Sequence, residues 1–200
     1  MHPRTPVRRR LLALGLPAAL ALGFPAAAAA AQPAPSEADA WRALHDGAVV
    51  LYRHAEAPGV GDPPGFRPGD CATQRNLSER GREQARRMGE QLRRQRVAVG
   101  AVWTSQWCRT RDTATLMDVG APRDEPAFNS FFAGHGDEAA QTAAARLKLL
   151  AWRGPGALVV VTHQVNITAL TGLNPASGEG IVLRPRGDAL EPAGRIEPPR

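Results

Sequence analysis

The sequence predicts an α/β domain: a three-layer α/β/α sandwich with a mostly parallel sheet. Three short apolar runs rich in β-branched residues, at residues 48–52, 99–104 and 157–162, have the uninterrupted apolarity of strands covered on both faces. Stretches with helical periodicity separate these runs. Alternating strands and helices are typical of βαβ units, in which consecutive strands run parallel.

Polar N-cap residues mark the starts of most of the expected helices. Ser36 begins a short helix over residues 36–45, and Asp137 begins one over residues 137–152. Ser78 begins a longer helix that reaches about residue 94, and a further helix over residues 109–117 follows the second strand. The expected inner faces are Ala85, Met88 and Leu92 in the 78–94 helix, and Ala140, Ala144, Leu147 and Ala151 in the 137–152 helix.

The N-terminal segment is predicted to be a cleaved export signal. Four arginines within the first ten residues precede an uncharged stretch rich in Leu and Ala, with small residues up to Ala31. A retained membrane anchor is disfavoured by Pro17 and Pro25. Removing residues 1–31 takes away four arginines and no acid. This leaves 21 basic and 19 acidic side chains and reduces the net charge from +6 to +2. We therefore expect an exported, periplasmic protein without a stable membrane span after signal cleavage.

The remaining chain divides into a tether, a domain and a tail. Residues 32–47 hold a Pro/Ala tether and a short helix, 48–183 form the domain, and 184–200 form a C-terminal tail, expected to be an edge strand that fades into a disordered end. Residues 57–70 are too rich in Pro and Gly for regular structure, and a loop of that length is usually functional. Eight arginines over residues 75–96 are interleaved with glutamates, which favours a solvated helix face over nucleic-acid contact.

Basic residues follow all three predicted strands. Arg53 and His54 come directly after the first strand, Arg109 follows the second, and His163 follows the third. In an open parallel sheet the carboxyl ends of the strands meet along one edge, where ligands bind. Guanidinium groups bind phosphate oxygens bidentately, so two arginines beside two histidines predict a pocket for a tetrahedral anion such as phosphate.

Four segments resemble branch 1 of the histidine phosphatase superfamily, the phosphoglycerate-mutase-like group. They are RHAE at 53–56, NLSERGREQA at 76–85, SQWCRTRDTA at 105–114 and VTHQVN at 161–166. The resemblance implies that His54 is the nucleophile that becomes phosphohistidine, and that Arg53, Arg109 and His163 bind the phosphate. Gln164, through its backbone amide, and Asn76 are expected to help bind substrate, and Asn76 could equally stabilise the turn before Ser78.

The carboxylate that usually serves as the family's general acid is missing from its usual place in this chain or displaced to another one. The segment that aligns with it, residues 126–134, contains no carboxylate. Glu56, Asp70, Asp137 and Glu138 are the alternatives, and each could instead be a surface charge or, for Asp137, an N-cap. Without a strong acid, substrates with good leaving groups are favoured, such as phosphoanhydrides, phenyl phosphates or a phosphohistidine.

Cys71 and Cys108 either form a disulfide or are two buried thiols, and the export signal favours the disulfide. Since Cys108 directly precedes Arg109, a bridge would fix the loop that carries Cys71 to the arginine of the pocket.

The expected function is that of an exported, metal-independent phosphatase with no cofactor and a small phosphorylated substrate, such as an envelope sugar phosphate. The alternative is a weak or inactive pseudoenzyme that binds a phosphorylated ligand, and a phosphoglycerate mutase is a less favoured one. The histidines lack the spacing of a metal motif, and no nucleic-acid partner is expected.

Overall fold

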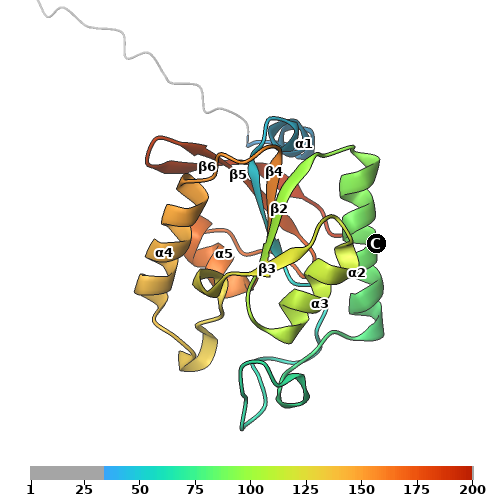
Figure 1. The fold of residues 1–200 in the computed structure, drawn as a ribbon, viewed down its shortest axis with the longest axis vertical. Helices are drawn as coiled ribbons and strands as arrows, with labels where there is room; N and C mark the ends of the chain where they lie inside the picture. Colours follow the sequence, from blue (N-terminus) through green and yellow to red (C-terminus); the bar gives the residue numbers. More distant parts are fainter. Residues whose placement is uncertain (1–33, 200) are drawn as a thin grey trace, which may run out of the picture. The chain divides into compact units, whose positions relative to one another are not determined.

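A six-stranded sheet forms the centre of the computed structural model, which describes residues 34–199 (Figure 1). The strand order is β3-β2-β4-β1-β5-β6. β1 and β2 run parallel to β4, and β3 runs parallel to β2, whereas β5 is antiparallel to β1 and β6 to β5. The strands are β1 (Val49–Arg53), β2 (Val99–Thr104), β3 (Pro122–Asp124), β4 (Ala157–Thr162), β5 (Gly180–Arg186) and β6 (Ala189–Ile196). The three predicted strands are thus confirmed to within one residue.

Among the described residues, five α-helices cover the two faces of this sheet, which confirms the predicted sandwich (Figure 1). The first three pack on one face and the last two on the other. Three short 3₁₀ helices lie in the connections. The α-helices are α1 (Glu37–His45), α2 (Glu79–Arg94), α3 (Cys108–Met117), α4 (Glu138–Leu150) and α5 (Gln164–Thr171), and the 3₁₀ helices are η1 (Cys71–Thr73), η2 (Pro126–Phe128) and η3 (Phe132–Gly134).

The core follows from the alternation of side chains along buried strands. In β1, Val50 and Tyr52 belong to the apolar cluster with α1, α2 and α3, whereas Val49 and Leu51 belong to the cluster with α4 and α5. All six residues of β4 are buried, as an apolar run between two helical layers requires.

The expected N-caps are present. The side chains of Ser36, Ser78 and Asp137 each accept a hydrogen bond from a backbone amide in the first turn of α1, α2 and α4. Each of the three helices therefore begins where the sequence predicts.

The predicted inner face of α4 is right only for Ala144, which packs against the core. The buried residues of this helix are Ala145 and Leu149, whereas Leu147 is 69% exposed. Because small apolar residues occur on every side of this Ala-rich helix, periodicity alone does not identify the face that packs.

The predicted edge strand in the C-terminal segment is present, as β6, but the segment does not fade after it begins: β5 and β6 form a hairpin that continues to Ile196. Its prolines lie where the sheet tolerates them. Pro192 is on the edge strand β6, and Pro185 lies beyond the part of β5 that pairs with β1.

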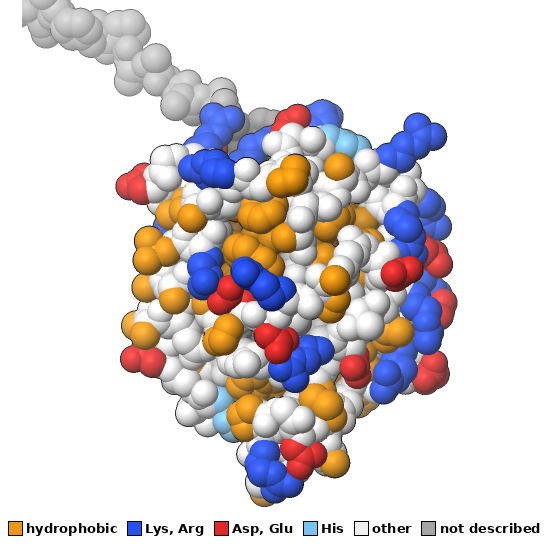
Figure 2. Space-filling model, viewed as in Figure 1, with side chains coloured by type: hydrophobic (Ala, Val, Ile, Leu, Met, Phe, Trp, Pro, Cys, Tyr) orange, Lys and Arg blue, Asp and Glu red, His pale blue; other side chains and the backbone are white. Residues whose placement is uncertain are grey.

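The surface of α2 carries charges of both signs, as Figure 2 shows at the right of the molecule. Arg82, Arg86 and Arg94 each pair with a glutamate three or four residues away. This part of the basic stretch is therefore the solvated helix face that was expected. Within residues 34–199 no helix is long and apolar enough to cross a membrane. The predicted signal, residues 1–31, lies outside the described residues.

Candidate active site

The four basic residues expected at the strand ends line one cavity of about 140 Å³. Arg53 is the last residue of β1 and His54 follows it, Arg109 lies in the first turn of α3, and His163 precedes α5. The structure thus brings together side chains that are more than a hundred residues apart in the sequence. The other lining residues are Gly59, Val60, Gly61, Arg75, Ser130, Phe132, Gln164 and Val165.

His54 is oriented by a hydrogen bond to its neighbour's backbone. Its Nδ1 lies 2.7 Å from the carbonyl oxygen of Ala55, so Nδ1 carries the proton and Nε2 keeps its lone pair. Its backbone amide donates to Thr162 of β4 at 3.0 Å. The nitrogen with the free lone pair is therefore the one available to attack an electrophile.

His163 is held between a serine and an arginine. Its Nε2 lies 2.8 Å from the Ser105 hydroxyl, and its Nδ1 lies 3.4 Å from Nη2 of Arg109. Since an arginine nitrogen only donates, Nδ1 is the acceptor and Nε2 carries the proton. The ring centres of His54 and His163 are 5.6 Å apart.

Both histidines are neutral near pH 7. Burial, followed by the positive charge of Arg109, lowers the pKa of His54 to about 3. The same two causes lower the pKa of His163 well below its usual value. A neutral imidazole has the lone pair that a nucleophile needs.

Two arginines of the cavity have unused buried donors. Nη1 of Arg53 donates to the carbonyl of Pro175 at 3.0 Å. The Nε atoms of Arg53 and Arg109 are buried and have no hydrogen-bond partner among the described residues. An unsatisfied buried N–H is costly, and an anion in the cavity would satisfy such donors.

Arg75 is a third arginine of the cavity, and the sequence interpretation placed it wrongly on a solvated helix face. It lies before α2, in the loop, and its guanidinium donates to the carbonyls of Gly61 and Ala57. Burial, followed by Arg109, lowers its pKa to about 10. The available signal was its position ahead of the Ser78 cap, which excludes it from the helix.

Asp62 is an acidic residue of the site that sequence reasoning missed. Its carboxylate accepts from Nη1 and Nη2 of Arg109 at 2.7 and 3.3 Å, from the Arg75 amide at 3.0 Å and from the Trp107 indole at 3.0 Å. The Arg109 and Asp62 side chains are only 4% and 3% exposed. Burial raises the pKa of Asp62, but the hydrogen bonds from Arg109 and the Arg75 amide outweigh it, so the pKa is lowered.

The two expected substrate-binding residues have different positions. Gln164 lines the cavity, and because it is the first residue of α5 its backbone amide is one of the free donors of that helix. Its side-chain amide donates to Asn174. Asn76 does not line the cavity and donates to the carbonyl of Cys71 at 2.7 Å, which supports its alternative role in the turn.

None of the four candidate general acids lines the cavity. Glu56 pairs with Arg80 at 3.0 Å, and Asp70 binds Arg67. Asp137 caps α4 and Glu138 is exposed in its first turn. The segment that aligns with the family's acid contributes Ser130 and Phe132, neither of which can act as an acid near neutral pH.

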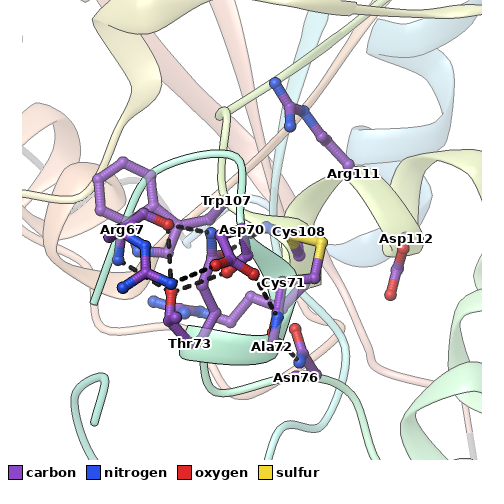
Figure 3. Close-up of a disulfide and its surroundings, with 12 residues drawn as sticks. Arg67, Asp70, Cys71, Ala72, Thr73, Asn76, Trp107, Cys108, Arg111 and Asp112 are labelled. Atoms are coloured by element: carbon purple, nitrogen blue, oxygen red, sulfur yellow. Dashed lines mark hydrogen bonds and ion pairs between the residues drawn. A yellow bond between two sulfur atoms is a disulfide. The ribbon is translucent and has the colours of Figure 1, made fainter. Parts of the chain in front are cut away.

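Cys71 and Cys108 form a disulfide, so the expected pairing is confirmed. Figure 3 shows the bridge between η1 and the start of α3. The Cys108 amide also donates to the side chain of Gln74 at 2.9 Å. The loop that carries Asp62 and Arg75 is thereby attached covalently to the helix that carries Arg109.

Within residues 34–199 no group of three or more His, Cys, Asp or Glu side chains is arranged to hold a metal ion.

Comparisons with known proteins agree with this geometry. The family model of the histidine phosphatase superfamily (branch 1) matches residues 49–135. No curated protein sequence matches the chain at a significant level.

Several solved structures share the fold. The product of an open reading frame of Mycobacterium tuberculosis is 15% identical with a TM-score of 0.57, over 74% of this chain and 96% of that chain. A mycobacterial glucosyl-3-phosphoglycerate phosphatase is 19% identical with a TM-score of 0.52, over 68% and 89%. The protein histidine phosphatase SixA, complexed with tungstate, is 15% identical with a TM-score of 0.52, over 76% and 97%.

Proposed function

The chain belongs to branch 1 of the histidine phosphatase superfamily, and we propose that it is a phosphatase that uses His54 as its nucleophile. The observation that carries this proposal is the neutral, buried His54, whose unprotonated Nε2 stands beside three arginines in one small cavity. Such an arrangement combines a nucleophile with fixed donors for a phosphoryl group.

The reaction proceeds in two displacements. Nε2 of His54 forms a bond to phosphorus while the bond between phosphorus and the leaving oxygen breaks, which gives a phosphohistidine. Water then attacks the same phosphorus, and the phosphorus–nitrogen bond breaks to return neutral His54 and free phosphate. Arg53, Arg75 and Arg109 stabilise the negative charge on the equatorial oxygens in both steps.

We propose substrates whose leaving group departs without strong acid assistance, since no carboxylate of the described residues lines the cavity. These are phosphomonoesters of acidic alcohols such as phenols, phosphoanhydrides or a phosphohistidine. The rim supports an apolar leaving group, because Val60 and Phe132 line the cavity and are 88% and 44% exposed. An envelope sugar phosphate is the competing substrate class, which a rim of this kind favours less.

We also propose that the enzyme is exported to the periplasm. The charge and apolarity of residues 1–31 support export, and the Cys71–Cys108 disulfide is of the kind that persists in oxidising compartments. A phosphoglycerate mutase remains the less favoured activity, because an exported protein would not meet glycolytic intermediates.

A pseudoenzyme that only binds a phosphorylated ligand is the second candidate, and it is favoured because the described residues place no acid in the cavity. The test is hydrolysis of p-nitrophenyl phosphate in EDTA by the mature wild type, His54→Ala and the matched control His45→Ala. His45 is exposed at the end of α1 and does not line the cavity. The activated leaving group needs little acid help, so a missing acid does not hide activity.

The proposed function requires wild-type turnover that persists in His45→Ala and disappears in His54→Ala. No turnover by folded, oxidised wild type that still binds phosphate would establish the pseudoenzyme instead. A series of aryl and sugar phosphates, assayed on the same proteins, then separates the two substrate classes.

A further inference from the structure

The charges around the cavity are unequal in number. Arg53, Arg75 and Arg109 bring three positive charges, His54 and His163 are neutral, and Asp62 brings one negative charge through its contact with Arg109. The net charge of this group is therefore +2. A phosphomonoester carries a charge of about −1.5 to −2 near pH 7, so the balance matches a bound substrate.

Asp62 also occupies part of the donor set of Arg109. It takes one N–H from each terminal nitrogen of that guanidinium. Nη1 also donates to the carbonyl of Arg75 and Nη2 approaches His163, whereas Nε has no partner within residues 34–199. An arginine has five N–H donors in a fixed plane, so holding one edge of the fork fixes the direction of the others.

The Asp62 carboxylate accepts hydrogen bonds from further parts of the chain besides the Arg109 side chain. The same carboxylate accepts from the amide of Arg75 in the loop and from the indole of Trp107 immediately before α3. Gly61, next to Asp62, accepts from the Arg75 side chain. One carboxylate thus positions two of the three cavity arginines relative to each other.

We propose that Asp62 is a positioning residue that fixes Arg109 and limits the positive charge of the pocket, so that inorganic phosphate leaves after hydrolysis. This inference rests on the proposed phosphatase function. A pocket with three uncompensated arginines binds the product dianion more tightly, and a guanidinium without its carboxylate no longer presents fixed donors to the reacting phosphoryl group.

Asp62→Asn tests the proposal, with Asp124→Asn as the matched control. Asp124 binds Arg111 of the same helix α3 through two guanidinium nitrogens and lies outside the cavity. The measurements are kcat and KM for p-nitrophenyl phosphate, the Kd of inorganic phosphate by calorimetry, and the melting temperature.

For Asp62→Asn we expect phosphate to bind about 3- to 10-fold more tightly, because a nearby negative charge is removed. The same variant is expected to lose about 10-fold in kcat without an increase in KM. Asp124→Asn is expected to match the wild type in all four quantities. A residue that only supports the fold would instead raise KM and weaken phosphate binding together.

The proposal is overturned if Asp62→Asn weakens phosphate binding, or if its kcat stays within twofold of the wild type. Phosphate binding needs no turnover, so an inactive wild type refutes the phosphatase function while the affinity comparison still tests Asp62. Should Asp62→Asn fail to fold, Asp62→Glu is the second variant, because it retains the negative charge and displaces the Arg109 guanidinium. Its phosphate Kd is then expected to stay within twofold of the wild type while kcat falls, and an unchanged kcat overturns the proposal.

Discussion

Two arginines on α3 each hold an aspartate by two nitrogens, and the two pairs differ mainly in burial. The Arg109 and Asp62 side chains are 4% and 3% exposed, whereas those of Arg111 and Asp124 are 35% and 40% exposed. Burial lowers the pKa of Arg109, with its hydrogen bond to Asp62 acting against the shift. The hydrogen bond to Asp124 raises the pKa of Arg111. Both aspartates thus act to raise the pKa of their arginine, and the net shifts are opposite because burial dominates at Arg109 and the hydrogen bond dominates at Arg111.

The difference shows that neither pair is explained by stability alone and that one of them serves a site. An exposed ion pair is screened by water and contributes little on its own. A buried pair costs desolvation that its attraction only partly offsets, so it is weak evidence for stability. The Arg109–Asp62 pair stands beside the cavity, where fixed charge has a chemical use, and the Arg111–Asp124 pair does not.

The largest expected contrast is in the free energy of unfolding. Asp62→Ala leaves the Arg109 charge buried without its partner, which we expect to cost about 3–5 kcal/mol. Asp124→Ala exposes Arg111 to water and is expected to cost at most about 1 kcal/mol. Urea denaturation of both variants measures the contrast. Equal losses would mean that the difference in burial has no energetic consequence.

The covalent attachment of the same loop gives a contrast of similar size. Replacing both cysteines by serine removes a bridge with a sequence separation of 37, and the loop-entropy model predicts a loss of about 4 kcal/mol. Because the bridge joins the loop of Asp62 and Arg75 to the helix of Arg109, we also expect lower turnover of p-nitrophenyl phosphate after reduction. Full activity after complete reduction, verified by thiol titration, would show that the ion pair alone holds the pocket.

Removing the arginines themselves compares the two pairs through catalysis. Arg109→Ala loses donors to the transferring phosphoryl group, and we expect kcat to fall by about 10²- to 10³-fold. Arg111→Ala removes the exposed arginine two residues further along α3 and is expected to stay within about twofold of the wild type. Steady-state kinetics of the two purified variants decides the matter, and similar losses in both would contradict the assignment of Arg109 to the pocket.

The sequence predicts the part of this site that lies at the strand ends, because local signals mark those positions. An apolar run that ends in Arg53 and His54, or in His163, identifies both a strand and the edge where it ends. The order of the motifs then indicates the family without any knowledge of contacts. The Ser78 cap defines the start of α2 in the same local way.

The loop over the cavity, which carries Asp62 and Arg75, could not be predicted, because its contacts join residues that are distant in the sequence. Asp62 reaches Arg109 across 47 residues from a loop rich in Pro and Gly, where no periodicity shows which side chains turn inward. Arg75 looks like one more arginine of a basic stretch until the loop is placed over the cavity. The hairpin of β5 and β6 was predicted only as an edge strand that fades into disorder, because proline lowers strand propensity without excluding an edge position.

The smallest expected effect sharpens the comparison through pH, because Arg109 lies beside buried histidines and Arg111 does not. In the unfolded chain a histidine binds a proton below about pH 6.5, whereas folded His54 stays neutral down to about pH 3. The unfolded state therefore binds more protons in this window, and stability decreases as the pH falls.

Between pH 6.5 and 5, where carboxylates stay ionised, we expect the free energy of unfolding to fall by about 1.5 kcal/mol for each buried histidine. Urea denaturation of wild type and His54→Gln at these two pH values measures it, and His54→Gln should show a smaller loss than wild type. A wild-type stability that does not change over this range would mean that His54 is accessible to protons in the folded state, and that Arg109 does not lie in the dry, charged environment that separates it from Arg111.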